Sequence, residues 1–183
     1  MDEGRLIVCL GWGSLIWDPR DLPLRQPVLW YEDGPALPIE FARKSQNGRI
    51  TLVLLDEGPA VPMLWSQLDV TTIDEARTSL AHREECGVTA IGCWPSKGPI
   101  FEHTAAIGQW ASSRGITGVV WTALPPLFDG STRVATADQI VGYLRSLTGS
   151  TQRLAREYVC KTPTQVKTPY RMIIERTLGW TPT

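Results

Sequence analysis

The stretch Gly11-Trp12-Gly13-Ser14-Leu15-Ile16-Trp17-Asp18-Pro19 follows directly on the apolar run Leu6-Ile7-Val8-Cys9-Leu10. The apolar run predicts a buried strand, and the two glycines after it let the backbone turn tightly and bring its N–H groups close to a ligand. Pro19 ends the loop, and the tryptophans beside the glycines can wall a small pocket. The pattern therefore predicts a strand that leads into an anion-binding loop, although Gly-x-Gly after a strand also occurs in unrelated turns.

The loop matches none of three well-known ligand-binding loops. It lacks the GxGxxG pattern of a dinucleotide fingerprint and the lysine of a phosphate-binding P-loop, and Ser14 is not framed as the GxSxG of a nucleophile elbow. What remains is a short loop of backbone N–H groups, which suits a carboxylate.

A second informative feature is the segment 71–85, which predicts a helix. A threonine stands at its start as a candidate N-cap, acidic residues follow in the first turn, no proline or glycine interrupts it, and Gly87 is the expected stop. At about 100° per residue, Glu84 falls on the stripe of apolar residues, whereas Glu85 falls on the polar side. Glu84 is therefore expected to face the core.

A carboxylate that faces the core loses hydration, which gives Glu84 two interpretations. Desolvation favours the protonated form unless Arg83 or another cation reaches it, and a carboxyl poised in this way can act as both general acid and general base. The alternative is a buried glutamate paired with an arginine for structural reasons, since such ion pairs also perturb ionisation.

Length and composition indicate one globular domain that covers residues 1–183. Hydrophobic residues make up 43% of the chain and charged residues 20%, proportions that are ordinary for a soluble protein. The sequence shows no signal-peptide pattern and no apolar stretch long enough to cross a bilayer, so we expect a cytoplasmic location and no membrane partner. The oligomeric state is left open.

The four cysteines, Cys9, Cys86, Cys93 and Cys160, show no CxxC pair and no zinc-finger spacing. Such residues are most simply buried thiols of a protein in a reducing compartment. A Cys86–His103 nucleophile pair, or a zinc site that adds Cys93, would rest on residue identity alone. We therefore expect no metal site.

Charge is distributed unevenly along the chain. There are 10 basic and 16 acidic residues up to Gly130, against 8 basic and 3 acidic residues beyond it. The basic residues of the second part are spread rather than clustered, which indicates a solvated helical face; the alternative is a surface for nucleic acid or another acidic partner. We expect no nucleic-acid partner.

The order of the apolar runs predicts an α+β fold with most strands first and most helices last. Asn47-Gly48, between two runs, predicts a hairpin. Helical spacing predicts a basic helical C-terminal part from about residue 133, packed on a strongly curved or closed mixed β-sheet, a small barrel. The expected strands are 6–10, 28–31, 37–42, 50–55, 63–68, 89–94 and 118–123, and the expected helices are 71–85, 104–113, 137–147, 151–159 and 168–178.

The loop, the order of elements and Glu84 together resemble the gamma-glutamylcyclotransferase-like superfamily, and within it the ChaC-type enzymes. The stretch from Trp12 to Pro19 is similar to the Tyr-Gly-Ser-Leu loop of that family and to its ChaC-type continuation. The strand at 63–68, followed by a helix that ends His82-Arg83-Glu84-Glu85-Cys86-Gly87, resembles the family's strand and its helix ending in Arg-Glu. The sequence departs from the family pattern in two places: Trp12 replaces the usual tyrosine, and the stretch Glu85-Cys86-Gly87 replaces the usual continuation after the catalytic residue.

The resemblance implies an enzyme that cyclises glutathione or another small-molecule γ-glutamyl amide to 5-oxoproline and releases an amine. It implies that Glu84 is the catalytic residue and that the loop formed by Trp12, Gly13, Ser14 and Leu15 binds the substrate. Arg43 is a candidate second clamp for a carboxylate, and the alternative for it is a surface ion pair. The resemblance implies no cofactor.

A second hypothesis is a non-catalytic binding or regulatory module of the same fold that keeps a pocket for a small amino-acid-like ligand. Trp12, which removes a hydroxyl from the edge of the pocket, favours this module. Glu84 favours the enzyme, because an unused buried carboxylate costs stability and a binding module would be expected to lose it.

Overall fold

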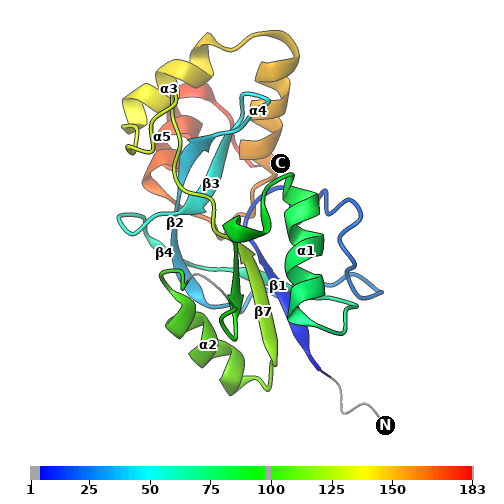
Figure 1. Ribbon diagram of the computed structural model, residues 1–183. Coiled ribbons are helices and arrows are strands. Elements are labelled where there is room, and N and C mark those ends of the chain that lie inside the picture. The colour runs from blue at the N-terminus through cyan, green and yellow to red at the C-terminus, as the bar shows by residue number, and fades with distance from the viewer. Residues whose placement is uncertain (1–4, 98–99, 183) are drawn as a thin grey trace. The chain divides into compact units, whose positions relative to one another are not determined.

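The computed structural model describes residues 5–97 and 100–182, and this part of the chain forms five α-helices and two β-sheets (Figure 1). The α+β class predicted from the sequence is confirmed. The chain divides into two compact units, and the single domain expected from composition stays a prediction. The first unit comprises Met1–Gly11, Asp18–Ala36 and Pro62–Leu124, and the second comprises Trp12–Trp17, Leu37–Val61 and Pro125–Thr183.

The first unit contains a four-stranded sheet with the order β5-β1-β7-β6. Strand β1 (Ile7–Gly11) pairs antiparallel with β5 and parallel with β7, and all five of its residues are buried. This burial explains why β1 is a continuous apolar run rather than an alternating one. The other strands of this sheet are β5 (Leu64–Gln67), β6 (Ile91–Trp94) and β7 (Gly118–Thr122).

Helix α1 (Ile73–Glu84) packs against β1, β6 and β7 of this sheet. The side chain of Thr72 caps its start by accepting a hydrogen bond from the Glu75 N–H group at 3.2 Å, as the sequence predicts. The helix ends at Glu84, before the expected stop at Gly87, because Glu85 takes the left-handed conformation with φ of 54°. A one-turn 3-10 helix, η1 (Val88–Ala90), leads from there into β6.

Helix α2 (Thr104–Ser113) also belongs to the first unit and packs against β6 and β7. Its bounds agree with the predicted helix. The strand expected at 89–94 starts later, at Ile91, because η1 occupies its first residues.

The prediction of a strand at 28–31 is wrong. Within this segment only Tyr31 forms a bridge, with Trp65 of β5, and the rings of these two residues stack with centroids 4.4 Å apart. Leu29 is 52% exposed. Tyr31 alone reaches the edge strand β5, and Val28 is exposed like Leu29. β-Formers in a short run do not by themselves make a strand, because β-propensity depends on packing against neighbouring strands.

The second unit contains a three-stranded sheet with the order β3-β2-β4. Its strands are β2 (Ala36–Lys44), β3 (Ile50–Leu54) and β4 (Ala60–Pro62). The hairpin predicted at Asn47-Gly48 is confirmed: Gly48 has a φ of 80°, and the Ser45 N–H group donates to the Arg49 carbonyl at 2.8 Å. Strand β4 was not among the expected strands, since its three residues are too few to show a period.

Three helices complete the second unit: α3 (Ala137–Ser146), α4 (Gly149–Lys161) and α5 (Pro169–Leu178). Helix α4 packs on β3, and α3 packs against α5. Local sequence explains where α3 and α5 start. Thr136 and Gln139 form a capping box at α3, and Thr168 caps α5 with Pro169 in its first turn.

The closed or strongly curved sheet expected from the sequence is not confirmed. Both sheets are open over the described residues: β5 and β6 are the edges of one, and β3 and β4 are the edges of the other. Over the same residues, no helix combines the length and the apolar character needed to cross a membrane.

Candidate active site

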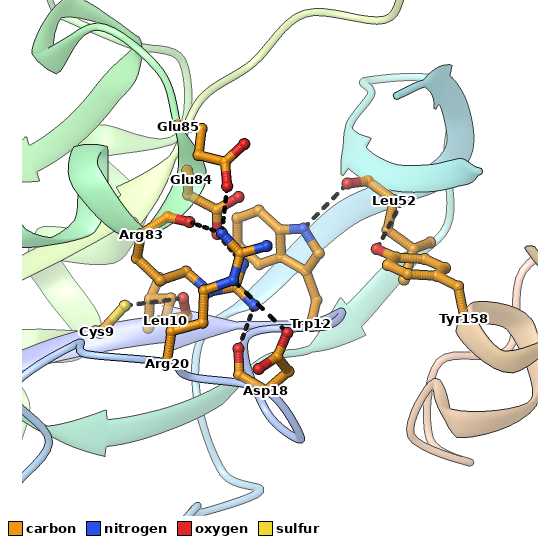
Figure 2. Close-up of polar contacts among 10 residues, drawn as sticks. All are labelled: Cys9, Leu10, Trp12, Asp18, Arg20, Leu52, Arg83, Glu84, Glu85 and Tyr158. Atoms are coloured by element: carbon orange, nitrogen blue, oxygen red, sulfur yellow. Dashed lines mark hydrogen bonds and ion pairs between the residues drawn. The ribbon is translucent and has the colours of Figure 1, made fainter. Parts of the chain in front are cut away.

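Glu84 lies at the last position of α1 and is held by its neighbour Arg83. The Nη1 atom of Arg83 lies 2.8 Å from the Oε1 atom of Glu84, and the side chain of Glu84 is 20% exposed (Figure 2). The next residue, Glu85, has a side chain that is 68% exposed. Arg83, the cation named from the sequence, therefore reaches Glu84. The ion pair is the arrangement of the structural alternative, and the catalytic role of Glu84 stays a prediction.

Arg83 also ties α1 to the segment that starts at Asp18. Its side chain is 5% exposed, and its Nη2 atom donates to the Asp18 carbonyl at 2.5 Å. Arg20, in the same segment, donates to the Arg83 carbonyl at 3.3 Å and to the Glu85 carboxylate at 2.6 Å. Arg83 of α1 and Arg20 thus connect the end of α1 to residues 18–20 by hydrogen bonds. Glu84 lies between Arg83 and Glu85, the two residues that make these contacts.

Cys9 of β1 lies beside this group (Figure 2). It is fully buried and donates to the carbonyl of Leu10 at 3.4 Å. Burial raises the pKa of the Cys9 thiol, the Glu84 carboxylate raises it further, and Arg83 opposes the rise. Cys9 is therefore a protonated thiol at neutral pH and not a nucleophile.

The loop predicted to bind an anion lies in the second unit. The Ile16 N–H group donates to the Gly13 carbonyl at 3.0 Å and closes a turn. Trp12, Gly13 and Leu15 are buried, whereas Ser14 is partly exposed. The binding of a small polar ligand by this loop stays a prediction.

The reason for glycine at position 13 differs from the expected one. Its φ is not in the left-handed range, so the turn itself does not demand glycine. A Cβ atom at position 13 would instead overlap the hydroxyl oxygen of Tyr158 and lie 3.0 Å from Cζ of the same ring. Position 13 is glycine because a side chain of α4 occupies the space.

Trp12 anchors the loop to β3. Its indole N–H group donates to the carbonyl of Leu52 at 3.3 Å, and the Leu52 N–H group donates to the Tyr158 hydroxyl at 3.2 Å (Figure 2). Trp12 is 6% exposed. Trp12 is thus a buried anchor, and its indole nitrogen is occupied by the backbone of Leu52.

Arg43, the candidate carboxylate clamp, lies on β2 and donates to the carbonyl of Pro125 at 2.7 Å. The contact fixes the direction of the side chain and stabilises the segment after β7. Arg43 therefore has a structural partner, and its role towards a ligand stays a prediction.

The structure places the predicted site residues in two groups. Glu84 belongs to the first unit with Arg83 and Arg20, and the loop residues belong to the second unit with Arg43. Sequence reasoning missed Arg20 and Tyr158. Arg20 stands in a loop without periodicity, and Tyr158 is one more aromatic residue on the buried stripe of α4, so nothing local marks either of them.

Comparison with known proteins gives matches to solved structures. No family model and no curated protein sequence matches the chain. Among the solved structures that do match, one is a selenomethionine-labelled gamma-glutamyl cyclotransferase specific to glutathione from yeast, with a TM-score of 0.51 and 14% identity. Another is a gamma-glutamyl cyclotransferase specific to glutathione from yeast, with a TM-score of 0.51 and 13% identity. The matches cover 97% and 95% of this chain and 98% of each yeast chain.

The chain has the fold of these yeast cyclotransferases. The match extends over both units and not over one motif alone. At this level of identity the likeness concerns the fold, since one fold can carry many activities.

Proposed function

We propose that this protein is a gamma-glutamyl cyclotransferase that converts glutathione or another γ-glutamyl amide to 5-oxoproline and a free amine. One observation carries the proposal: the Glu84 carboxylate at the end of α1 is fixed by the buried guanidinium of Arg83 and its side chain is still 20% exposed, so a substrate can reach it. The fold shared with the glutathione-specific yeast enzymes supports it further.

In the proposed reaction the α-amino nitrogen of the substrate attacks its own γ-carbonyl carbon. A C–N bond closes the five-membered ring, and the amide bond to the leaving nitrogen breaks. The α-ammonium gives up two protons in becoming the ring N–H. Glu84 takes the first and returns it to the leaving nitrogen, and the second ends on the released amine, which is protonated at neutral pH. Proton transfer of this kind contributes about 10²–10⁴ in rate.

The loop has a separate role in the proposal. Its backbone N–H groups at Gly13, Ser14 and Leu15 bind the α-carboxylate of the substrate, and Arg43 assists as a second cation. Holding that carboxylate folds the flexible γ-glutamyl chain towards ring closure, which supplies acceleration by orientation. The chemistry uses side chains and backbone of this chain and calls for no cofactor.

The proposal is tested by incubating the purified protein with glutathione, γ-glutamylcysteine and γ-glutamyl derivatives of small amines, and measuring 5-oxoproline by mass spectrometry. We expect 5-oxoproline from at least one member of the panel. Binding without any 5-oxoproline would contradict the proposal and favour a ligand-binding module of the same fold.

A further inference from the structure

Strand β3 is an edge strand of the three-stranded sheet. The backbone N–H and C=O groups of one of its residues, Leu52, form hydrogen bonds with side chains. Edge strands leave backbone N–H and C=O groups without a neighbouring strand. At Leu52 the carbonyl accepts from the Trp12 indole and the N–H group donates to the Tyr158 hydroxyl. Leu52 of β3 thus connects the loop that contains Trp12 and Gly13 to helix α4.

Tyr158 is fixed tightly at this junction. It is 4% exposed, and its ring meets Trp17 edge-on with centroids 5.5 Å apart and Phe41 edge-on at 6.2 Å. The guanidinium carbon of Arg49 lies 5.5 Å from the centroid of the same ring. A ring held from several sides places its hydroxyl with little freedom.

The hydroxyl of Tyr158 lies where a side chain at position 13 would be. Gly13 approaches the oxygen so closely that a methyl group there would overlap it. The Gly13 backbone therefore packs close to the hydroxyl end of the Tyr158 ring, while Trp12, the residue before it, is fixed by its bond to Leu52.

We propose that Tyr158 is a positioning residue that sets the affinity of the loop for the α-carboxylate of the substrate. This inference rests on the carboxylate-binding role proposed for Gly13, Ser14 and Leu15. Tyr158 acts through Gly13 and Leu52: its hydroxyl holds the loop at a fixed distance from β3, so that the loop N–H groups converge on one point. Trp12 of the loop bonds the carbonyl of Leu52 and Tyr158 of α4 bonds its N–H group, so the loop and the helix are both tied to this one residue of β3.

The test is Tyr158→Phe, which keeps the ring and its packing and removes only the hydroxyl. The loss of one hydrogen bond and one contact is expected to loosen the loop and to raise the KM for the γ-glutamyl substrate about 10-fold, the equivalent of roughly 1.4 kcal/mol, with kcat changed less than 3-fold. The analogue 4-aminobutyryl-cysteinylglycine, which is glutathione without its α-carboxylate, should bind both forms equally.

Tyr143→Phe is the matched control. The Tyr143 hydroxyl donates to the Gly48 carbonyl at 2.8 Å, so this variant also loses one bond between a tyrosine and the backbone of the β2–β3 hairpin. Tyr143 makes no contact with the loop among those described. We expect its substitution to leave KM unchanged while lowering the urea midpoint of unfolding by an amount similar to that in Tyr158→Phe.

A second variant tests the contact between the hydroxyl and the loop directly. Gly13→Ala is expected to weaken substrate binding because its methyl group displaces the loop from Tyr158. In the Tyr158→Phe background the overlapping oxygen is gone and the remaining neighbours are Cζ at 3.0 Å and Cε2 at 3.4 Å, so the combined loss should be clearly smaller than the product of the two single losses.

Binding of glutathione to each protein, followed by tryptophan fluorescence, separates this inference from the proposed reaction. Turnover with equal KM in wild type and Tyr158→Phe would overturn the inference and leave the reaction standing. Glutathione binding without turnover would overturn the reaction, and the ratio of the two dissociation constants would still decide the role of Tyr158. Failure of the wild type to bind glutathione or any γ-glutamyl amide would overturn both.

Discussion

Arg83 and Glu84 are consecutive residues, yet their side chains form an ion pair with 2.8 Å between Nη1 and Oε1. Consecutive side chains of a helix point about 100° apart and do not normally face each other. The pair forms because the helix ends at Glu84 and because the Arg83 guanidinium also donates to the Asp18 carbonyl. A buried arginine thereby fixes the direction of the carboxylate to which we assign the chemistry.

Replacing Arg83 should damage turnover more than substrate binding. Arg83→Lys keeps the charge, but its single nitrogen lies on a shorter side chain and lacks the rigid fork by which two guanidinium nitrogens bond Glu84 and Asp18. We expect kcat to fall about 10²-fold, the scale of a misplaced catalytic group, with KM changed less than 3-fold. Steady-state kinetics on the substrate found in the panel measures both.

Arg77→Lys is the control for this prediction. Arg77 lies on the same helix and donates to the Val88 carbonyl at 3.2 Å, away from Glu84. Its substitution should leave kcat close to that of the wild type. An equal loss of kcat in the two variants would mean that any disturbance of α1 lowers activity, and Arg83 would then have no special role.

Glu84→Gln should abolish measurable 5-oxoproline formation while the protein stays folded. The amide keeps the shape of the side chain but cannot exchange a proton, so a loss of about 10²–10⁴ in kcat is expected. Glu85→Gln makes the same chemical change one residue later, at a side chain that is 68% exposed, and should lower kcat much less. If Glu85→Gln proved inactive and Glu84→Gln active, the assignment of the catalytic carboxylate would be wrong.

Most secondary structure could be predicted because it depends on short-range signals. The hairpin at Asn47-Gly48 and the cap of α1 at Thr72 need only a few consecutive residues, and both are confirmed. The prediction of a strand at 28–31 failed because strand pairing is a long-range property. The β-formers of this segment are typical of a strand, but only one of them reaches a partner strand, and pairing of that kind depends on residues far away in the chain.

In the candidate site, too, short-range features could be predicted and long-range contacts could not. Periodicity predicted a carboxylate at the buried side of α1, because residue identity and helix geometry suffice for that inference. The contacts that give the loop its shape could not be predicted: the Tyr158 hydroxyl reaches Gly13 from a helix more than a hundred residues later, and only tertiary structure brings them together. Position 13 was rightly expected to need glycine, but for a turn geometry that it does not adopt.

Activity should survive both chelation and thiol-blocking reagents. The proposed reaction moves protons through Glu84, so prolonged incubation with EDTA followed by the 5-oxoproline assay should leave kcat unchanged. Cys9, Cys93 and Cys160 are buried, and the pKa of Cys9 is raised by burial and then by Glu84, so these thiols should react slowly in the folded protein. Loss of activity on chelation, restored by added zinc, would overturn the proposed mechanism.

The second unit contains a buried carboxyl, Glu40 of β2, that should make stability depend on pH. Glu40 is 3% exposed and accepts hydrogen bonds from the Thr168 hydroxyl and from the N–H groups of Phe41 and Tyr170, at the start of α5. Burial raises the pKa of Glu40, and these three hydrogen bonds only partly oppose the rise. The folded protein therefore holds the Glu40 proton more tightly than the unfolded chain does.

The sign of the effect follows from this difference in proton binding. Between the ordinary pKa of 4.5 and the raised folded value, the folded state keeps its proton while the unfolded state has lost it, so the free energy of unfolding falls as pH rises through this window. Each pKa unit of difference is worth about 1.4 kcal/mol. Above the window the cost of the buried charge is present in full, and below pH 4.5 it is absent.

Glu40→Gln removes this titration and should change the pH dependence of stability. In urea unfolding followed by tryptophan fluorescence, the free energy of unfolding of the wild type relative to Glu40→Gln should increase as the pH is lowered from neutral towards 4.5. Glu57→Gln, at an exposed glutamate in the turn between β3 and β4, controls for the general loss of one carboxylate and should show no such trend. A wild type whose advantage over Glu40→Gln shrinks on acidification would show that the hydrogen bonds outweigh burial, so that the ionised carboxylate stabilises the start of α5.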